Sequence, residues 1–150
     1  MKAVYNKKAT FDYEILQKFE AGLVLTGQEV KAVKNNQINL KGAYVSLRYE
    51  PSPELFLIKA HISPYVKAGP LPDYDPERPR KLLLKKQEIK GLLGKLEQKG
   101  LTIVPLSVYT KRNLVKLSFG LAKGKKKYQK KEQKKNRDID KEISRTLKYQ

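Results

Sequence analysis

Residues 12–34, DYEILQKFEAGLVLTGQEVKAVK, decide the fold that the sequence predicts. In the first half of this stretch apolar and polar residues alternate, and a period of two is typical of a strand with one buried face. Gln17 interrupts the apolar series, and Gly22 indicates a bulge or a sharp bend inside the strand. The apolar positions of one parity are Tyr13, Ile15, Phe19, Ala21, Leu23 and Leu25.

A short helix is predicted directly after this strand. Thr26 stands three residues before Glu29, which is the spacing of a capping box and starts the helix at Gly27. Asn35 and Asn36 are suitable ends, because asparagine tolerates the left-handed conformation that ends helices. A long bent strand that leads into a short helix is a suitable beginning for a small closed β-barrel.

Composition limits the class of protein. The 150 residues fit one domain with a tail, and the absence of cysteine excludes disulfides, a thiol nucleophile and a cysteine-ligated metal. The net charge of +18 indicates a polyanionic partner, with nucleic acid as the first choice. No apolar run approaches the roughly 20 residues that cross a bilayer, and no signal-peptide core or basic amphipathic membrane helix stands out. We therefore expect a cytoplasmic protein without a membrane partner.

Two hairpins are predicted from the same alternation of apolar and polar residues. Pro51-Ser52-Pro53 forms the turn of the first hairpin, and Lys111–Asn113 forms the turn of the second. Pro105 indicates an edge position or a bulge, because proline lacks the N–H that a central strand needs. The strands are residues 43–50 and 55–62 in the first hairpin, and residues 101–109 and 114–122 in the second.

A helix with one buried stripe is predicted ahead of the second hairpin. Ile89, Leu92, Leu93 and Leu96 have the spacing of such a stripe, and Gly100 is the predicted stop. The run Leu82–Leu84 precedes this helix, and three adjacent leucines do not all face inward. We expect one or more of them to be exposed or to line the surface under the preceding loop.

That loop, residues 63–80, contains five prolines and is too long to be a simple connection. Asp73, Asp75 and Glu77 alternate within it, and a magnesium site there would support a metal-dependent nuclease. Pro76 breaks the strand that would hold these acids together, so we expect solvated loop residues and no metal. His61, the only histidine, lacks a catalytic partner and is expected to be structural or a surface contact.

The globular pattern ends at Ala122, which we take as the boundary of a domain of residues 1–122. Residues 123–150 carry ten Lys and two Arg against two Asp and two Glu. Too little apolar surface remains to offset the ordering entropy, so we expect this basic tail to be disordered when free. The tail either folds on a polyanion or only improves solubility. Tyr128, among the lysines, favours the first alternative because it can stack on a base.

A series of short motifs runs through nearly the whole chain in a fixed order. They are Asn6-Lys7-Lys8-Ala9, Tyr13-Glu14-Ile15, Glu20-Ala21-Gly22, Leu25–Lys31, Ile62–Tyr65, Asp75-Pro76, Arg78, Arg80–Leu84, Glu88-Ile89, Lys99–Thr102, Val104–Leu106, Tyr109 and Ala122–Lys126. Through them the chain resembles the SmpB family, which binds transfer-messenger RNA in bacterial trans-translation. Each motif alone is weak, but their order and spacing are specific together.

The resemblance implies a closed antiparallel β-barrel of the oligonucleotide-binding type, with short flanking helices. It also implies an RNA-binding protein rather than an enzyme, without cofactor or small-molecule substrate. The expected partners are the tRNA-like part of transfer-messenger RNA and the stalled ribosome, and we expect a monomer. A general ribosomal or structured-RNA-binding barrel protein remains the alternative.

Three positions, Asn6, Glu20 and Leu83, match positions implicated in RNA binding in the family. Glu20 either accepts a hydrogen bond from a base edge or 2′-hydroxyl, or only braces a lysine or arginine of the barrel. Leu83 is either a platform under a base or plain core. The basic residues near the N-terminus either contact RNA or belong to a solvated terminus. The candidate RNA-binding residues are Asn6, Lys7, Lys8, Glu20, Lys31, Arg80, Lys81 and Leu83.

In the family the tail is thought to enter the empty mRNA channel, become helical and approach the decoding region of the small subunit. The candidate ribosome-binding residues of the tail are Gly124, Lys125, Lys126, Tyr128, Lys130 and Lys131. Where family members usually have Asp-Lys-Arg, this chain has Gln129-Lys130-Lys131. The acidic group is lost, and lysine does not reproduce the planar fork of arginine.

Overall fold

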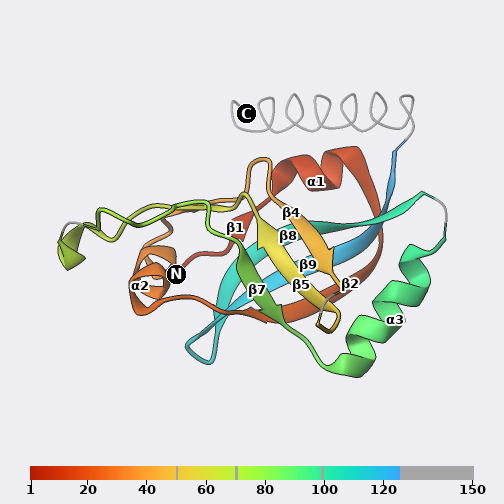
Figure 1. The fold of residues 1–150 in the computed structure, drawn as a ribbon. Coiled ribbons are helices and arrows are strands. Elements are labelled where there is room, and N and C mark those ends of the chain that lie inside the picture. Colours follow the sequence, from red (N-terminus) through yellow and green to blue (C-terminus); the bar gives the residue numbers. More distant parts are fainter. Residues whose placement is uncertain (50, 70, 99, 126–150) are drawn as a thin grey trace, which may run out of the picture.

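The computed structural model describes residues 1–49, 51–69, 71–98 and 100–125. An antiparallel sheet of seven strands in the order β1-β8-β9-β2-β7-β5-β4 dominates it, and a small second sheet pairs β3 with β6 (Figure 1). The mainly β fold class is therefore confirmed. The strands are β1 Val4–Tyr5, β2 Tyr13–Leu23, β3 Ile38–Asn39, β4 Tyr44–Arg48, β5 Glu54–Ile58, β6 His61–Ile62, β7 Arg80–Leu83, β8 Leu101–Lys111 and β9 Leu114–Gly124. The helices are α1 Lys7–Asp12, α2 Gly27–Lys34 and α3 Lys86–Leu96, with a 3₁₀-helix, η1, at Val66–Ala68.

Strand β2 exists as predicted, but its bulge does not lie at Gly22. The register between β2 and β9 shifts between Ile15 and Gln17, so Leu16 is the extra residue. One extra residue moves every later side chain to the other face of the sheet. The prediction that one set of alternate residues is buried along the whole of β2 is therefore wrong. The polar Gln17, which interrupts the apolar series, marks the position of the bulge.

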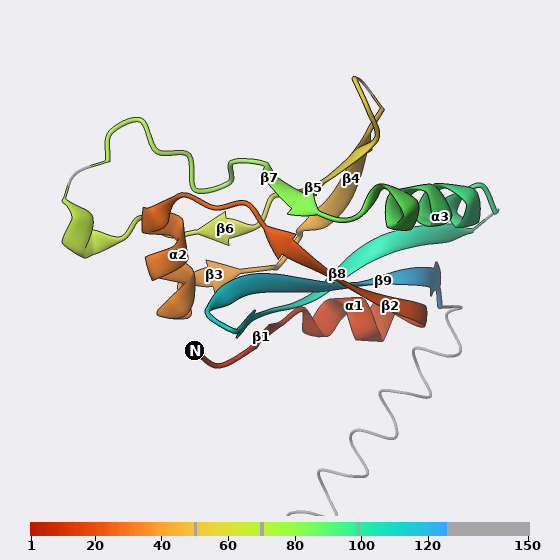
Figure 2. The same ribbon diagram turned by 90° about the horizontal axis from the view of Figure 1, so that it is seen from below.

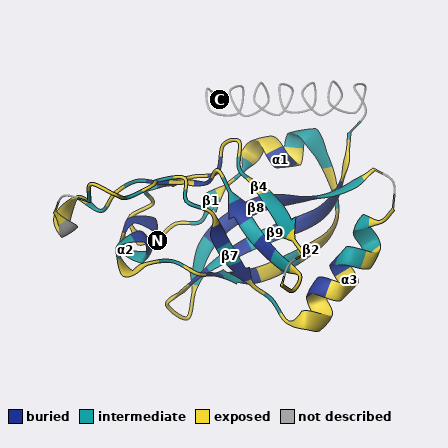
Figure 3. Cartoon of the chain, in the orientation of Figure 1, coloured by how far each residue is buried: buried dark blue, intermediate teal, exposed yellow. Residues whose placement is uncertain are grey.

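Two apolar clusters result, one on each face of the sheet. Phe19, Ala21 and Leu23 belong to the main core, together with residues of β5, β7, β8 and β9. Tyr13 and Ile15, before the bulge, pack instead in a small cluster with Ala9, Val104, Leu106 and Ala122. Figure 2 shows α1 on the side of β8 and β9 that faces away from β7, β5 and β4. Helix α1 thus covers the second cluster. Figure 3 shows in dark blue the buried residues along the strands of the main sheet.

The N-terminal arm is part of the fold rather than a solvated terminus. Val4 and Tyr5 pair with Val108 and Ser107 of β8, which makes β1 an end strand of the main sheet. Neither β1 nor α1 is predicted from the sequence, because two residues of strand and six of helix carry too little periodicity to be recognised.

Helix α2 confirms the capping box. The Thr26 hydroxyl accepts from the backbone N–H of Glu29 at 3.2 Å, and the Thr26 N–H donates to Glu29 Oε1 at 3.0 Å. Asn35 is the C-cap, and Asn36 has a φ of 61°, so the predicted end is also confirmed. Local sequence specifies where this helix begins, since Thr26 and Glu29 lie within one turn of each other.

The first predicted hairpin is present as β4 and β5, but its second strand is shorter than residues 55–62. Strand β5 ends at Ile58, and Lys59 has a φ of 60°, which breaks the extended backbone. His61 and Ile62 then pair with β3 in the second sheet. The chain therefore changes sheets at Lys59 instead of continuing along β4.

The second hairpin, β8–β9, turns at Arg112 and Asn113, which both have positive φ as a type I′ turn requires. The β8–β9 register shifts between Pro105 and Ser107, so the predicted bulge at Pro105 is confirmed. The pairs between β1 and β8 involve Ser107 and Val108 and do not include Pro105.

Between the hairpins, Leu82 and Leu83 of the leucine run belong to a strand that was not predicted from the sequence, β7. Leu82 is buried, whereas the Leu83 side chain is 56% exposed, which confirms that the three leucines do not all face inward. Helix α3 follows and buries Ile89 and Leu92. It ends at Leu96 with Glu97 as its C-cap, so Gly100, with a φ of 85°, lies beyond the helix rather than ending it.

The sheet curves so that β4, at one end of the strand order, lies close to β8 near the other. Among the described residues no hydrogen-bonded ladder joins β4 to β8 or β1. Within that part of the chain no helix is long and apolar enough to cross a membrane. The predictions for Lys126, Tyr128, Lys130 and Lys131, and for the disordered state of the free tail, concern residues outside those that the structure describes.

Candidate nucleic-acid interface

Glu20 and Leu83 lie on the same exposed face of the sheet. Gly22 pairs with Leu83 of β7, and side chains directly opposite one another on neighbouring strands point to the same face. Glu20 is two residues before Gly22 and therefore shares that face, whereas Ala21 belongs to the main core on the other face. Leu83 is thus not a core residue.

Gly22 leaves a gap in this face beside Leu83. An added Cβ at Gly22 would lie 3.6 Å from the Leu83 side chain, which is ordinary van der Waals contact. The missing side chain therefore leaves one flank of Leu83 uncovered. An exposed leucine with an open flank offers a flat apolar surface of the kind on which a base can rest.

The same face continues across β9, β8 and β1. Lys116 pairs with both Gly22 and Tyr109, while Ser118 pairs with both Glu20 and Ser107. Tyr5 pairs with Ser107 at the end of the row and is 68% exposed. We call this surface the outer face; its residues are Tyr5, Glu20, Gly22, Leu83, Tyr109 and Lys116.

Glu20 is held by neighbours on this face. The Tyr109 hydroxyl donates to Glu20 Oε2, and Lys111 Nζ lies 3.5 Å from Glu20 Oε1. The hydrogen bond from Tyr109 and the nearby lysines keep the pKa of Glu20 below its usual 4.5. Burial and the Glu20 carboxylate together raise the pKa of Tyr109 to about 12. The carboxylate is therefore ionised and oriented, with Lys111 as the basic residue that it braces.

Tyr109, Lys111 and Lys116 were absent from the candidate set. Tyr109 belongs to the series of motifs shared with the family, so the sequence indicated that it matters. Nothing in the sequence connects it with Glu20, which is 89 residues away. Only the pairing of β2, β9 and β8 brings the two together.

Asn6 anchors the N-terminal arm to the bulge of β8. Its Nδ2 donates to the Pro105 carbonyl at 2.9 Å, and its backbone N–H donates to the Leu106 carbonyl at 2.7 Å. These bonds hold the start of α1 against the sheet, where Lys7 and Lys8 are exposed. The two lysines are thereby presented on an ordered helix.

Lys31 and Lys81 remain accessible to a ligand. Lys31 is exposed on α2, and its Nζ lies 5.7 Å from the centroid of the Tyr65 ring, which is a cation–π contact. Lys81 Nζ lies 3.2 Å from Glu54 Oε1, with 43% of the lysine side chain exposed. An exposed pair of this kind is weak and can exchange Glu54 for a phosphate.

Arg80 does not belong to this surface, which corrects its place among the candidate RNA-binding residues. Its side chain is fully buried. Arg80 Nε donates to Glu29 Oε2 at 2.9 Å, and Nη1 donates to the Ala60 carbonyl at 2.6 Å. A buried Glu29 carboxylate requires this partner, because an unpaired charge inside a protein is costly.

The same carboxylate ties down the long loop. Arg78 donates to Glu29 Oε1, and the Tyr74 hydroxyl donates to the Ile62 carbonyl at 2.8 Å. Burial alone would raise the pKa of Glu29, but the Thr26 N–H and the two guanidinium groups hold it below 4.5 on balance. Burial and the Glu29 charge raise the pKa of Tyr74. The motif around Asp75 to Arg80 therefore fixes the loop to α2.

The loop acids show no shared ligand geometry. Asp75 Oδ1 accepts from the Glu77 backbone N–H at 2.9 Å, which closes a local turn. Among the described residues no three His, Cys, Asp or Glu side chains come together as a metal site. His61 is exposed at the end of the second sheet, as expected of a surface residue.

Comparison with known proteins identifies the family. The family model for SmpB protein matches residues 3–149. An SsrA-binding protein of Cupriavidus necator is 50% identical over 143 residues, covering 95% of this chain and 93% of the relative. That of Acaryochloris marina is 48% identical, covering 95% and 91%. A solved chain from "tmRNA-SmpB: a journey to the center of the bacterial ribosome" is 46% identical, with a TM-score of 0.66, covering 83% of this chain and 85% of that one. The chain therefore belongs to the SmpB family.

Proposed function

We propose that this chain binds the tRNA-like part of transfer-messenger RNA and delivers it to stalled ribosomes for trans-translation. Family membership over residues 3–149 is the observation that carries the proposal. Two of its relatives are named SsrA-binding proteins. The solved relative comes from a structural study of tmRNA and SmpB in the bacterial ribosome. The role is binding and delivery, not catalysis.

The outer face supplies the chemistry that structured RNA requires. Folded RNA is recognised through stacked bases, 2′-hydroxyls and phosphates more than through groove sequence. Leu83 offers an apolar platform, and the ionised Glu20 accepts a hydrogen bond from a base amino group or 2′-hydroxyl. Lys7, Lys8 and Lys116 supply positive charge for phosphates along the same surface.

We infer that the sheet is a closed barrel of the oligonucleotide-binding type, with β4 and β8 on either side of the closure. The proximity of these two strands supports this assignment.

The tail is proposed to reach the mRNA channel and the decoding region of the small subunit, which places the protein in the cytoplasm. The domain boundary needs adjustment, because β9 continues to Gly124 and pairs there with Tyr13. The Lys125 backbone N–H also donates to the Asp12 carbonyl at 2.9 Å. We therefore place the start of the tail after Lys125, which leaves Gly124 and Lys125 with the folded domain.

The RNA that copurifies with the protein from its own cell tests the function most directly. Transfer-messenger RNA should be enriched over ordinary tRNA. Equal recovery of both RNAs would instead favour a general structured-RNA-binding protein, since the same charges attract any folded RNA.

A further inference from the structure

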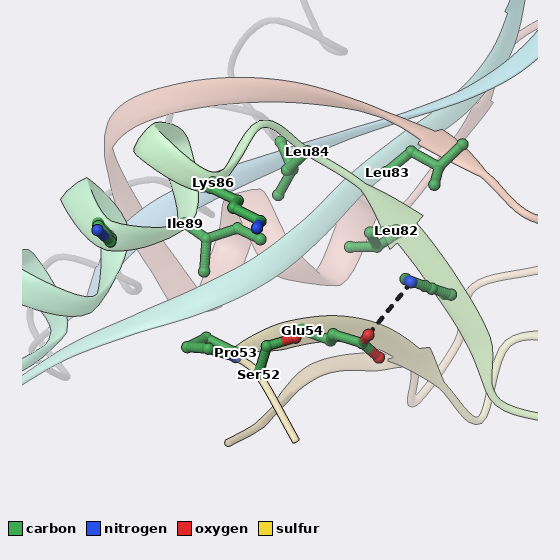
Figure 4. Close-up of a pocket in the computed structure, with 10 residues that line it drawn as sticks. Ser52, Pro53, Glu54, Leu82, Leu83, Leu84, Lys86 and Ile89 are labelled. Carbon is green, nitrogen blue, oxygen red and sulfur yellow. Dashed lines mark hydrogen bonds and ion pairs between the residues drawn. The ribbon is translucent and has the colours of Figure 1, made fainter. Parts of the chain in front are cut away.

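A groove of about 430 Å³ lies beside β7, between the β4–β5 turn and the start of α3. Figure 4 shows Ser52, Pro53 and Glu54 on one side of it, with Leu84, Lys86 and Ile89 on the other. Cavities of about 300–1,000 Å³ are the usual size of small-ligand sites. The groove is therefore large enough for one small planar ligand.

The lining of the groove combines an apolar floor with positive charge. Leu82 and Ile89 are buried and Leu84 is half-buried, so the floor is apolar. Three lysines line the rim, and Glu54 is the one acid among the described lining residues. The ligand that fits this combination has an apolar plane and a negative charge.

Two of the rim lysines repel each other, and a negatively charged ligand would remove this repulsion. Lys86 and Lys90 are four residues apart on α3 and line the same groove. Like charges at this spacing destabilise a helix. Glu54 is paired with Lys81 rather than with either of them. An anion between Lys86 and Lys90 would turn this repulsion into attraction.

We propose that the groove holds one unstacked nucleotide of a structured RNA. The base lies on the floor formed by Leu82, Leu84 and Ile89, and its phosphate lies against Lys86 and Lys90. The Glu54 carboxylate is placed to accept from an amino group of the base, with Lys81 balancing its charge. This inference deepens the proposed function and rests on it, since it names a second point of contact for the same RNA.

The position of the groove relative to Leu83 supports a nucleotide. Alternation along β7 points Leu83 to the outer face and Leu82 to the opposite side. Leu83 also lines the groove, so an RNA strand that rests on Leu83 lies directly beside it. One nucleotide splayed from such a strand reaches the groove without a change in the fold.

An acidic peptide fits the groove less well. Peptides commonly bind as an added strand on an open sheet edge. Here β7 is hydrogen-bonded to β2 on one side and to β5 on the other, so it offers no edge. A groove of this size, with lysines on its rim, fits one base and its phosphate better than an extended backbone.

Three variants test the proposal in the full-length protein. Ser52→Trp fills the groove from an exposed turn without changing charge, and Lys86→Gln with Lys90→Gln removes the two phosphate contacts. Lys41→Gln with Lys67→Gln is the matched control, because both lysines are exposed and neither lines the groove. Circular dichroism establishes that each variant is folded.

Affinity is measured for a transcript of the tRNA-like part of transfer-messenger RNA. Ser52→Trp should weaken binding about tenfold or more, because the base loses the apolar surface that it buries on the floor of the groove. The Lys86, Lys90 double variant should lower the slope of log K against log salt by about 1–2, and the control by less. Amide signals of Ser52, Lys86 and Ile89 should shift in NMR spectra when this transcript is added.

Parent-like affinity of Ser52→Trp, or groove amides that do not move on saturation with the transcript, would overturn the proposal. Amides that move with a polyglutamate peptide and not with the transcript would also overturn it and assign the groove to a protein partner. If the parent protein itself does not prefer the transcript to tRNA, the proposed function fails. If the parent keeps that preference and Ser52→Trp binds normally, the groove proposal alone fails.

Discussion

The guanidinium of Arg80 and the carboxylate of Glu29 face each other in the interior, with Nε 2.9 Å from Oε2 and both side chains closed to solvent. The pair joins the start of α2 to the start of β7. Because Arg78 and the Ala60 carbonyl complete the network, neither charge is left without a partner. Arg80 therefore belongs to the interior of the fold and not to the RNA-binding surface, although it lies in one of the motifs shared with the family.

Glu29→Ala should therefore destabilise the protein by about 3–5 kcal/mol at pH 7, since it leaves a buried guanidinium uncompensated. Urea unfolding measures this change. Glu54→Ala is the matched control and should cost less than about 1 kcal/mol, because the Glu54–Lys81 pair is partly exposed. Equal effects of the two substitutions would contradict a structural role for the buried pair.

The pH dependence of stability follows from the same carboxylate. The pKa of Glu29 is lower in the folded protein than its ordinary 4.5. Its contribution to stability is therefore present above about pH 4.5 and is lost as the pH falls through the folded-state pKa. Between pH 7 and pH 2.5 the melting temperature of the parent protein should fall by more than that of Glu29→Gln, because the variant has no carboxylate to protonate at this position. Parallel curves for the two proteins would contradict this assignment.

Glu20→Ala and Leu83→Asp should each weaken binding of transfer-messenger RNA and leave the fold intact. Both side chains are exposed on the outer face, so their replacement leaves the core unchanged. Loss of the apolar surface under a base at Leu83 should reduce affinity about tenfold. Val66→Asp, at a position 81% exposed on η1, is the control for the apolar-to-acid change. Parent-like affinity of both folded variants would mean that the RNA-binding face lies elsewhere.

Tyr109→Phe should release the Glu20 carboxylate. Without the phenolic donor, which is the largest influence on it, the pKa of Glu20 should rise toward 4.5. Carboxyl NMR of the labelled protein measures this change, with Tyr44→Phe as the control at another exposed tyrosine. RNA affinity should fall roughly twofold to tenfold, as expected for one lost hydrogen bond. An unchanged pKa of Glu20 would show that Tyr109 does not position it.

A chain that ends at Lys125 should fold and bind transfer-messenger RNA nearly as well as the full protein, yet fail to support peptide tagging on stalled ribosomes. It keeps every pair between β2 and β9, whereas a chain ending at Ala122 loses the partners of Tyr13 and Glu14. A purified tagging system, run beside an RNA titration, measures both activities. The shorter chain should have the lower melting temperature.

Changes within the tail should reproduce part of this defect. Tyr128→Ala, and the double change Lys130→Ala with Lys131→Ala, should lower tagging more than RNA binding. Normal tagging by the chain ending at Lys125 would show that the tail is not needed for tagging on stalled ribosomes. A parallel loss of RNA binding and tagging would mean that the boundary between the two functions is misplaced.

The sequence by itself determined the elements whose specification is local. The capping box at Thr26 and Glu29, the turn at Arg112 and Asn113, and the stripe of α3 all depend on partners within a few residues. The resemblance added the family, which the comparison confirms. The expectation that the leucine run is partly exposed also held, because adjacent side chains of any regular element point in different directions.

Tertiary structure alone decided which face and which partner each residue has. The bulge at Leu16 sends Tyr13 and Ile15 to a cluster under α1, because one inserted residue reverses the alternation of β2. Arg80 is buried beside its counter-ion Glu29, which lies 51 residues away in sequence. Tyr109 meets Glu20 across 89 residues through pairing of β2, β9 and β8. Periodicity reports only how a residue relates to its neighbours in the chain, so these long-range partners had to come from the folded structure.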